Sequence, residues 1–126
     1  MHNRNLEKLI PICMKVIKSL SDTNEKDMKT KNGIKKEFNG YFASFGPSVI
    51  MAGLNQTVSF YADASKKSKQ GYVNTIIWDV LKDMKWAEEE GSLSSYVSNG
   101  DILRKNRVLE VVTACKLSIR TFDLKE

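Results

Sequence analysis

The sequence has very little of the chemistry that enzymes use. Among its 126 residues there is one histidine, His2, and there are two cysteines, Cys13 and Cys115. General acid–base catalysis needs histidine or carboxylates that are brought together, whereas the acidic residues here are spread over the surfaces of predicted helices. A structural zinc site needs four close ligands, and neither cysteine belongs to a CxxC pair. We therefore predict no enzymatic activity, no metal and no cofactor, and we interpret both cysteines as reduced core residues.

Long apolar runs and glycine-rich loops are also missing. No run approaches the roughly 20 apolar residues that cross a bilayer, and the first residues lack the apolar core of a signal peptide. These observations predict a cytoplasmic protein. Gly40, Gly46 and Gly53 match neither phosphate-binding motif. No segment alternates like a strand, and no Asn-Gly hairpin signal occurs.

Lysine and arginine, in contrast, are abundant. Twenty of them face 15 acidic residues, which leaves a net charge of +5 and an isoelectric point near 9.2. This excess favours polyanionic partners such as nucleic acid. Apolar residues make up 41% and charged residues 28% of the chain, which is typical of a globular protein. The length predicts one domain over residues 1–126.

Apolar residues recur at steps of three and four along most of the chain, which predicts an all-α bundle of about six helices. The expected helices cover residues 6–20, 33–44, 47–62, 73–84, 93–97 and 101–121. Residues 22–32 are predicted to form a mobile polar loop. Gly46-Pro47 is expected to separate the second helix from the third, and Gly53 to allow close approach of a neighbouring helix. The predicted core includes Ile50, Leu54, Val58, Ile77, Val80, Val112 and Cys115.

Three basic clusters are candidate contacts for a nucleic-acid backbone. Lys66, Lys67 and Lys69 lie in a predicted connection, and Lys105, Lys116 and Arg120 lie within about 60° of one another on the last predicted helix. The third cluster is Arg4, just before the first predicted helix, with Lys8, Lys15 and Lys18 on that helix. Aromatic residues are not interleaved with these clusters, so any contact is expected to be to phosphates and independent of sequence. The alternative is that all three clusters are ordinary solvated surface.

The central segment of the sequence resembles a known family. Residues 41–61 read YFASFGPSVIMAGLNQTVSFY, and Ile50, the pair Gly53-Leu54 and the pair Phe60-Tyr61 match a pattern in the small all-helical subunit of type III-B CRISPR (Cmr) effector complexes. In that family a helix ends in a short break, and a new helix carries the isoleucine, the Gly-Leu pair and a following aromatic residue. The order of helices and the lysine-rich connection also agree.

The resemblance implies a non-catalytic subunit that acts in antiviral defence. Such a subunit is present in several copies beside the other subunits of the effector complex, and it helps to line a basic groove for guide and target RNA. Two alternatives stay open: the small subunit of the related type III-A complex, and a helical protein-interaction module without nucleic-acid binding.

Overall fold

The computed structural model describes residues 3–29, 33–64, 69–87, 91–98, 102–122 and 124–125. Within these ranges the chain forms seven helices and one pair of two-residue strands, which confirms the predicted all-α class. No helix in the described part is both long and apolar enough to cross a membrane. The helices are α1 (Asn3–Thr23), α2 (Glu25–Met28), α3 (Glu37–Ala52), α4 (Leu54–Ala64), α5 (Gly71–Asp83), α6 (Leu93–Val97) and α7 (Ile102–Ile119).

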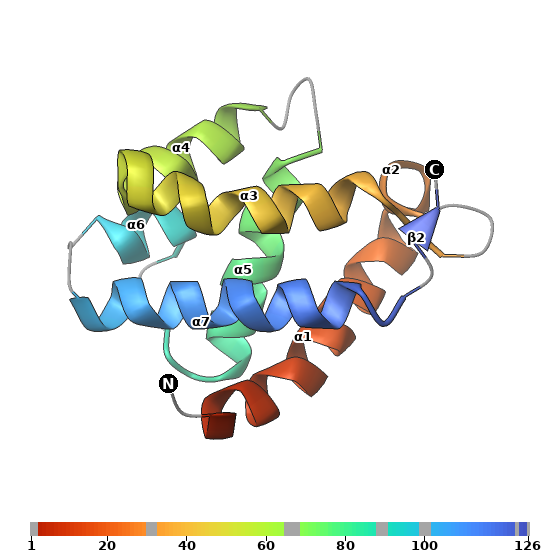
Figure 1. Ribbon diagram of the computed structural model, residues 1–126, viewed down its shortest axis with the longest axis horizontal. Coiled ribbons are helices and arrows are strands. Elements are labelled where there is room, and N and C mark those ends of the chain that lie inside the picture. Colours follow the sequence, from red (N-terminus) through yellow and green to blue (C-terminus); the bar gives the residue numbers. More distant parts are fainter. Residues whose placement is uncertain are drawn as a thin grey trace.

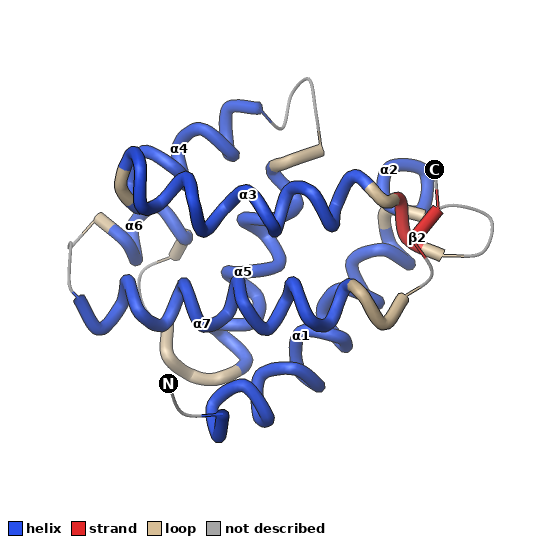
Figure 2. Tube along the Cα trace, in the orientation of Figure 1, coloured by secondary structure: helices blue, strands red, loops and turns tan. Residues whose placement is uncertain are grey.

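Helices α3 and α7 form the front of the molecule, where they lie side by side and run in opposite directions (Figure 1). Helix α5 crosses behind them, and α1 packs against both α7 and α5. The short strands β1 (Ile34–Lys35) and β2 (Leu124–Lys125) pair in parallel beside the start of α3 and the end of α7 (Figure 2). The sequence did not predict this pair, because two residues are too few to show strand alternation.

The core is formed by the apolar stripes that the sequence predicts. Val73, Ile76, Ile77, Val80 and Leu81 of α5 are all buried, as expected from their spacing. Both cysteines are buried and unbonded, and their Sγ atoms lie 3.3 Å apart where α1 packs on α7. Burial is the main reason that the pKa of the Cys115 thiol is raised well above its ordinary value.

The polar segment 22–32 is not a loop over its described part. Helix α1 continues to Thr23 and α2 follows at once, while residues 30–32 lie outside the described residues. Met28, the one apolar residue of the segment, is fully buried and anchors α2 on the core. The loop prediction is therefore wrong for residues 22–23 and 25–28, because a single buried side chain outweighs a polar composition.

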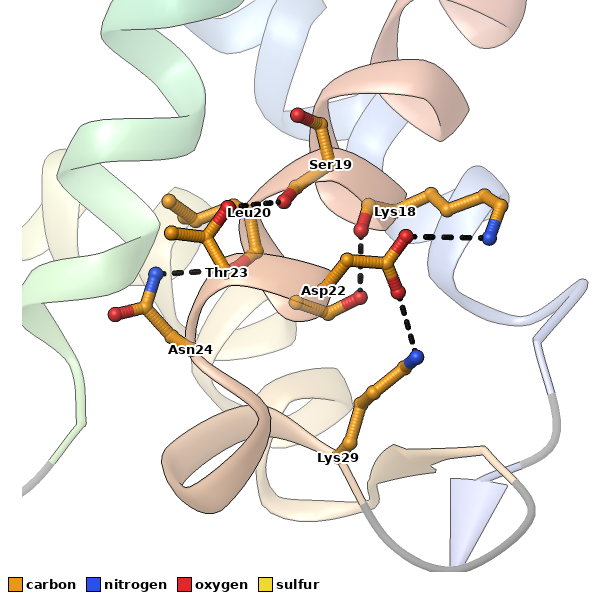
Figure 3. A network of polar contacts seen from close by, with 8 residues as sticks. Lys18, Ser19, Leu20, Asp22, Thr23, Asn24 and Lys29 are labelled. Carbon is orange, nitrogen blue, oxygen red and sulfur yellow. Dashed lines mark hydrogen bonds and ion pairs between the residues drawn. The ribbon is translucent and has the colours of Figure 1, made fainter.

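Polar side chains close the corner between α1 and α2 (Figure 3). Thr23 Oγ1 donates to the Ser19 carbonyl at 3.0 Å and Asn24 Nδ2 to the Leu20 carbonyl at 3.0 Å, so these side chains satisfy carbonyls at the end of α1. The Asp22 carboxylate accepts from Lys29 Nζ at 2.5 Å and from Lys18 Nζ at 3.3 Å. Hydrogen bonds from Lys29 and then Lys18 lower the pKa of Asp22, and the bond to Asp22 raises the pKa of Lys29.

The break between the third and fourth helices is at Gly53, not at Gly46-Pro47 as predicted. Helix α3 passes through Pro47, because Gly46 has no Cβ to clash with the proline ring in the helical conformation. Gly53 has φ 92° and ψ 159°, a combination open essentially to glycine alone. No atom lies within 4 Å of the position that a Cβ on Gly53 would take. The expected close approach of a neighbouring helix is therefore wrong, and the glycine serves the turn.

The predicted core is correct at five of its seven positions: Val58, Ile77, Val80, Val112 and Cys115 are buried. Leu54 is only partly buried. Ile50 is 83% exposed, so its assignment to the core is wrong. Helix α3 is apolar on nearly all sides, and the face that turns inward is the one with Phe38, Phe42, Phe45 and Val49.

Candidate nucleic-acid interface

Helix α7 has one face in the core and one face in solvent. Its buried residues are Val108, Val111, Val112, Ala114, Cys115, Ser118 and Ile119. Lys105 and Arg120 are exposed and Lys116 is partly exposed. At 100° per residue the three cations fall within about 60° of one another on the solvent side. The structure thus places Lys105 and Lys116 of the predicted α7 cluster on one accessible face of α7, and Arg120 in the turn that directly follows the helix.

The spacing of the α7 cluster follows from the rise of 1.5 Å per residue. Lys116 and Arg120 are separated by one turn, about 6 Å along the axis, and Lys105 lies about 16 Å before Lys116. None of the three forms an ion pair with an acidic residue in the described part of the chain. Two cations on one side of α7 and a third directly after it, without a carboxylate partner among the described residues, can donate hydrogen bonds to phosphate oxygens.

Two arginines of α7 have a structural role instead. The Arg104 guanidinium donates to the Tyr96 carbonyl at 2.9 Å and lies 4.7 Å from the centre of the Tyr96 ring. The Arg107 guanidinium lies 5.0 Å from the Trp86 ring. These cation–π contacts join α7 to α6 and to the segment after α5. Helical geometry already places both arginines outside the α7 cluster, but the sequence alone did not predict their contacts with Tyr96 and Trp86.

The loop cluster is not assembled within the described residues. Lys66 and Lys67 lie outside them. Lys69 is described, and its Nζ lies 3.7 Å from Glu37 Oε1. The other oxygen of Glu37 accepts from the Tyr41 hydroxyl at 2.7 Å, and burial followed by this bond raises the pKa of Tyr41 to about 12. Lys69 therefore already has a carboxylate partner, which makes it a weaker candidate for phosphate.

The cations of the first helix are also largely compensated. Lys15 Nζ lies 3.1 Å from Asp83 Oδ2, and Lys18 pairs with Asp22. Lys8 is exposed, and the side chain of Arg4 lies outside the described part of the chain. Of the three basic clusters, the α7 cluster is the one whose described cations all lack an acidic partner.

The described residues hold no group of three or more histidine, cysteine, aspartate or glutamate side chains that could bind a metal ion. His2 lies outside these residues. Comparison of the chain with protein-family models, with curated proteins and with solved structures finds no match.

Sequence reasoning missed a second kind of surface. Ile50, Met51 and Phe60 are exposed by 83%, 86% and 60%, although all three are large and apolar. The available signal was the absence of charge: residues 38–62 contain no aspartate, glutamate, lysine or arginine. At the average content of 28%, a stretch of this length would carry about seven charged residues.

Proposed function

We propose that this chain is a non-catalytic small subunit of a type III-B CRISPR effector complex, in which the α7 cluster contacts the phosphate backbone of guide or target RNA. The observation that supports the RNA contact is that Lys105 and Lys116 on α7 and Arg120 just after it are accessible and have no acidic partner within the described part of the chain. The family assignment rests on the resemblance of residues 41–61 in sequence. The all-helical fold is compatible with it, whereas the helix break at Gly53 puts Ile50 on a different helix from Leu54 and Phe60, unlike the family pattern.

A single copy offers few phosphate contacts, so its own affinity for RNA is low. Copies that are held side by side in a complex would act together, because each bound copy raises the effective concentration of RNA at the next. The contacts are made to the backbone, so binding does not depend on the RNA sequence. In this proposal the subunit supports the RNA and other subunits cut it.

Salt dependence of RNA binding tests the proposal. Each phosphate neutralised on single-stranded RNA contributes about −0.7 to the slope of log affinity against log salt. Replacing all three residues of the α7 cluster by glutamine should reduce the magnitude of this slope by up to about two, equally for unrelated sequences. The measurement is RNA binding by the reconstituted complex at several salt concentrations.

A matched control removes the same charge elsewhere. Lys26, Lys36 and Lys85 are exposed and belong to none of the three basic clusters, so their triple glutamine variant also loses three positive charges. It should change the slope much less, because only long-range attraction is lost. If both triple variants assemble normally and change the slope equally, the α7 cluster is ordinary solvated surface.

A second candidate function is a helical protein-interaction module without nucleic-acid binding, and the exposed Ile50, Met51 and Phe60 favour it. The type III-A small subunit is a further alternative within the same class. Gene neighbourhood discriminates these possibilities: adjacent CRISPR repeats and genes for the large effector subunits would support the CRISPR assignments. If the gene lies beside genes of unrelated function, without CRISPR repeats or effector-subunit genes nearby, the interaction module would be favoured.

A further inference from the structure

The packing of α1 on α7 brings the two cysteines of the chain into contact. Cys13 on α1 and Cys115 on α7 are 102 positions apart in sequence, and their Sγ atoms lie 3.3 Å apart. Both side chains are fully buried. The sequence contains no other cysteine. Every thiol of the protein therefore lies in this one buried pair, where the first helix meets the last.

A buried serine fixes the contact between the two helices about one turn from each cysteine. Ser118 is fully buried, and its hydroxyl lies 3.2 Å from the Ile10 carbonyl of α1 and 2.7 Å from the Ala114 carbonyl of α7. Ile10 precedes Cys13 by three residues, and Ser118 follows Cys115 by three. The two sulfurs are therefore held opposite each other by a polar link as well as by apolar packing.

The two thiols have different places in the pair. The Cys115 thiol donates a hydrogen bond to the Cys13 sulfur. Burial, followed by this hydrogen bond, raises the pKa of Cys115, so that Cys115 keeps its proton. Because the nucleophile of cysteine chemistry is the thiolate and not the thiol, Cys13 is the sulfur that reacts first.

We propose that Cys13 and Cys115 form a reversible disulfide that joins α1 to α7 when the chain meets an oxidising small disulfide such as glutathione disulfide. The Cys13 thiolate attacks one sulfur of the small disulfide, whose S–S bond breaks, and the first small thiol leaves with the proton that Cys13 lost. Cys115 then attacks the Cys13 sulfur of the mixed disulfide, and the second small thiol leaves with the Cys115 proton. The protein thus loses two electrons and two protons, which reduce the small disulfide to two thiols.

The bond requires a small movement and a route for the oxidant. Bonded sulfurs are about 2.05 Å apart, so the two Sγ atoms must approach by a further ~1.3 Å. Pro11, two residues before Cys13, lacks the amide that would bond to the Glu7 carbonyl, so this part of α1 has one backbone hydrogen bond fewer. Local opening of α1 at this point gives the oxidant access to the pair.

The disulfide would close a loop that contains all the helices from α2 to α6. A cross-link over such a length removes many conformations from the unfolded chain, so it stabilises the fold. In a reducing compartment such a disulfide is transient, so the pair responds to the redox state of its surroundings. It forms whether or not the chain binds RNA, because both sulfurs are buried and lie outside the surface proposed to contact RNA.

Incubation of the reduced, native chain with glutathione disulfide tests the inference. The chain is then unfolded in the presence of an alkylating reagent, and its mass shows how many thiols remain free. We expect no alkylated cysteine, a mass lower by two hydrogen atoms, and migration as a single chain in non-reducing electrophoresis. Tm should rise by about 10 °C or more and return to its initial value after reduction with dithiothreitol.

Cys13→Ala and Cys115→Ala are matched controls, since each removes one partner of the bond. Glutathione disulfide should not raise the Tm of either variant. The wild-type measurement needs no variant, so it decides the question even if a variant fails to fold. Two alkylated thiols after prolonged incubation overturn the inference, as does a disulfide between chains or a stable adduct with glutathione. An intramolecular bond without a rise in Tm would contradict the stabilising link between α1 and α7.

Discussion

Helices α3 and α7 lie side by side, yet the side chains that they turn to solvent differ in charge. Helix α7 buries a stripe of valine, cysteine and isoleucine and turns Lys105 and Lys116 to solvent, together with the apolar Ile102, Leu103 and Leu117. Helix α3 buries four apolar side chains and turns Ile50 and Met51 to solvent. Charge on the outside of α7 is compatible with a monomer in water. Apolar residues on the outside of α3 lower the solubility of such a monomer unless another surface covers them.

The largest expected effect separates the two faces of α3. Phe45 is fully buried and packs edge-to-face on Tyr61, with centroids 5.0 Å apart. Phe45→Ala should lower the free energy of unfolding by about 3–5 kcal/mol, because it leaves a cavity in the core. Met51→Ala, on the outer face, should change it by no more than about 0.5 kcal/mol. Urea denaturation of the two variants at a concentration where the chain is monomeric measures both effects. If Phe45→Ala and Met51→Ala lower the free energy of unfolding by similar amounts, Met51 is not exposed in solution.

Changes in stability of intermediate size are expected at Gly40, within α3, and at Gly53, directly after it. Gly53 adopts φ 92° and ψ 159°, so Gly53→Ala should destabilise the fold by about 1–3 kcal/mol. Gly40 lies within α3, and a Cβ added there would meet no atom within 4 Å, so Gly40→Ala should stabilise by about 0.4–1 kcal/mol. Thermal unfolding should therefore show shifts of Tm in opposite directions. If Tm shifts equally in the two variants, the helix break does not lie at Gly53.

The smallest effect is expected at the exposed Asp22 network. Because the folded-state pKa of Asp22 is lowered, its stabilisation is present above the ordinary carboxyl pKa of 3.8 and is lost as pH falls through the lowered value. The raised pKa of Lys29 gives stabilisation that is present below 10.5 and is lost as pH rises through the raised value. Asp22→Asn should lower Tm slightly at neutral pH, and the difference should disappear in acid.

Screening by salt should also reduce the Asp22→Asn effect, since all three side chains of the network are accessible to solvent. Glu7→Gln changes the same charge at an exposed site of α1 and serves as the control. A difference between wild type and Asp22→Asn that persists in acid would assign the effect to lost packing rather than to charge.

Regular amphipathic patterns made most of the fold predictable. The stripes of α5 and α7 and the short α6 were located from spacing alone, because their buried apolar residues recur at steps of three and four. The same reasoning failed on α3 and α4, which are apolar on more than one side. Ile50 and Val49 are adjacent and similarly apolar in the sequence, but Val49 is 2% exposed and Ile50 is 83% exposed.

The candidate site was predictable to a similar extent. The α7 cluster was predicted from helical geometry, since three cations within about 60° must share a face. The pairing of Lys69 with Glu37 and the stacking of Arg107 on Trp86 were not predictable, because each joins segments that meet only in three dimensions. These pairings reduce the number of accessible cations without changing the net charge.

The sequence by itself determined the helical class, the positive charge and the spacing of cations along α7, because these depend on composition and on a fixed period of 3.6 residues. It also supplied a glycine for the turn at Gly53, where φ is 92°, although it did not reveal which of several glycines has that role. Only the tertiary structure decided which side of α3 faces the core and that Cys13 meets Cys115 across 102 positions of sequence. Those outcomes depend on how helices pack against each other, and local periodicity contains no information about the neighbour that a face will meet.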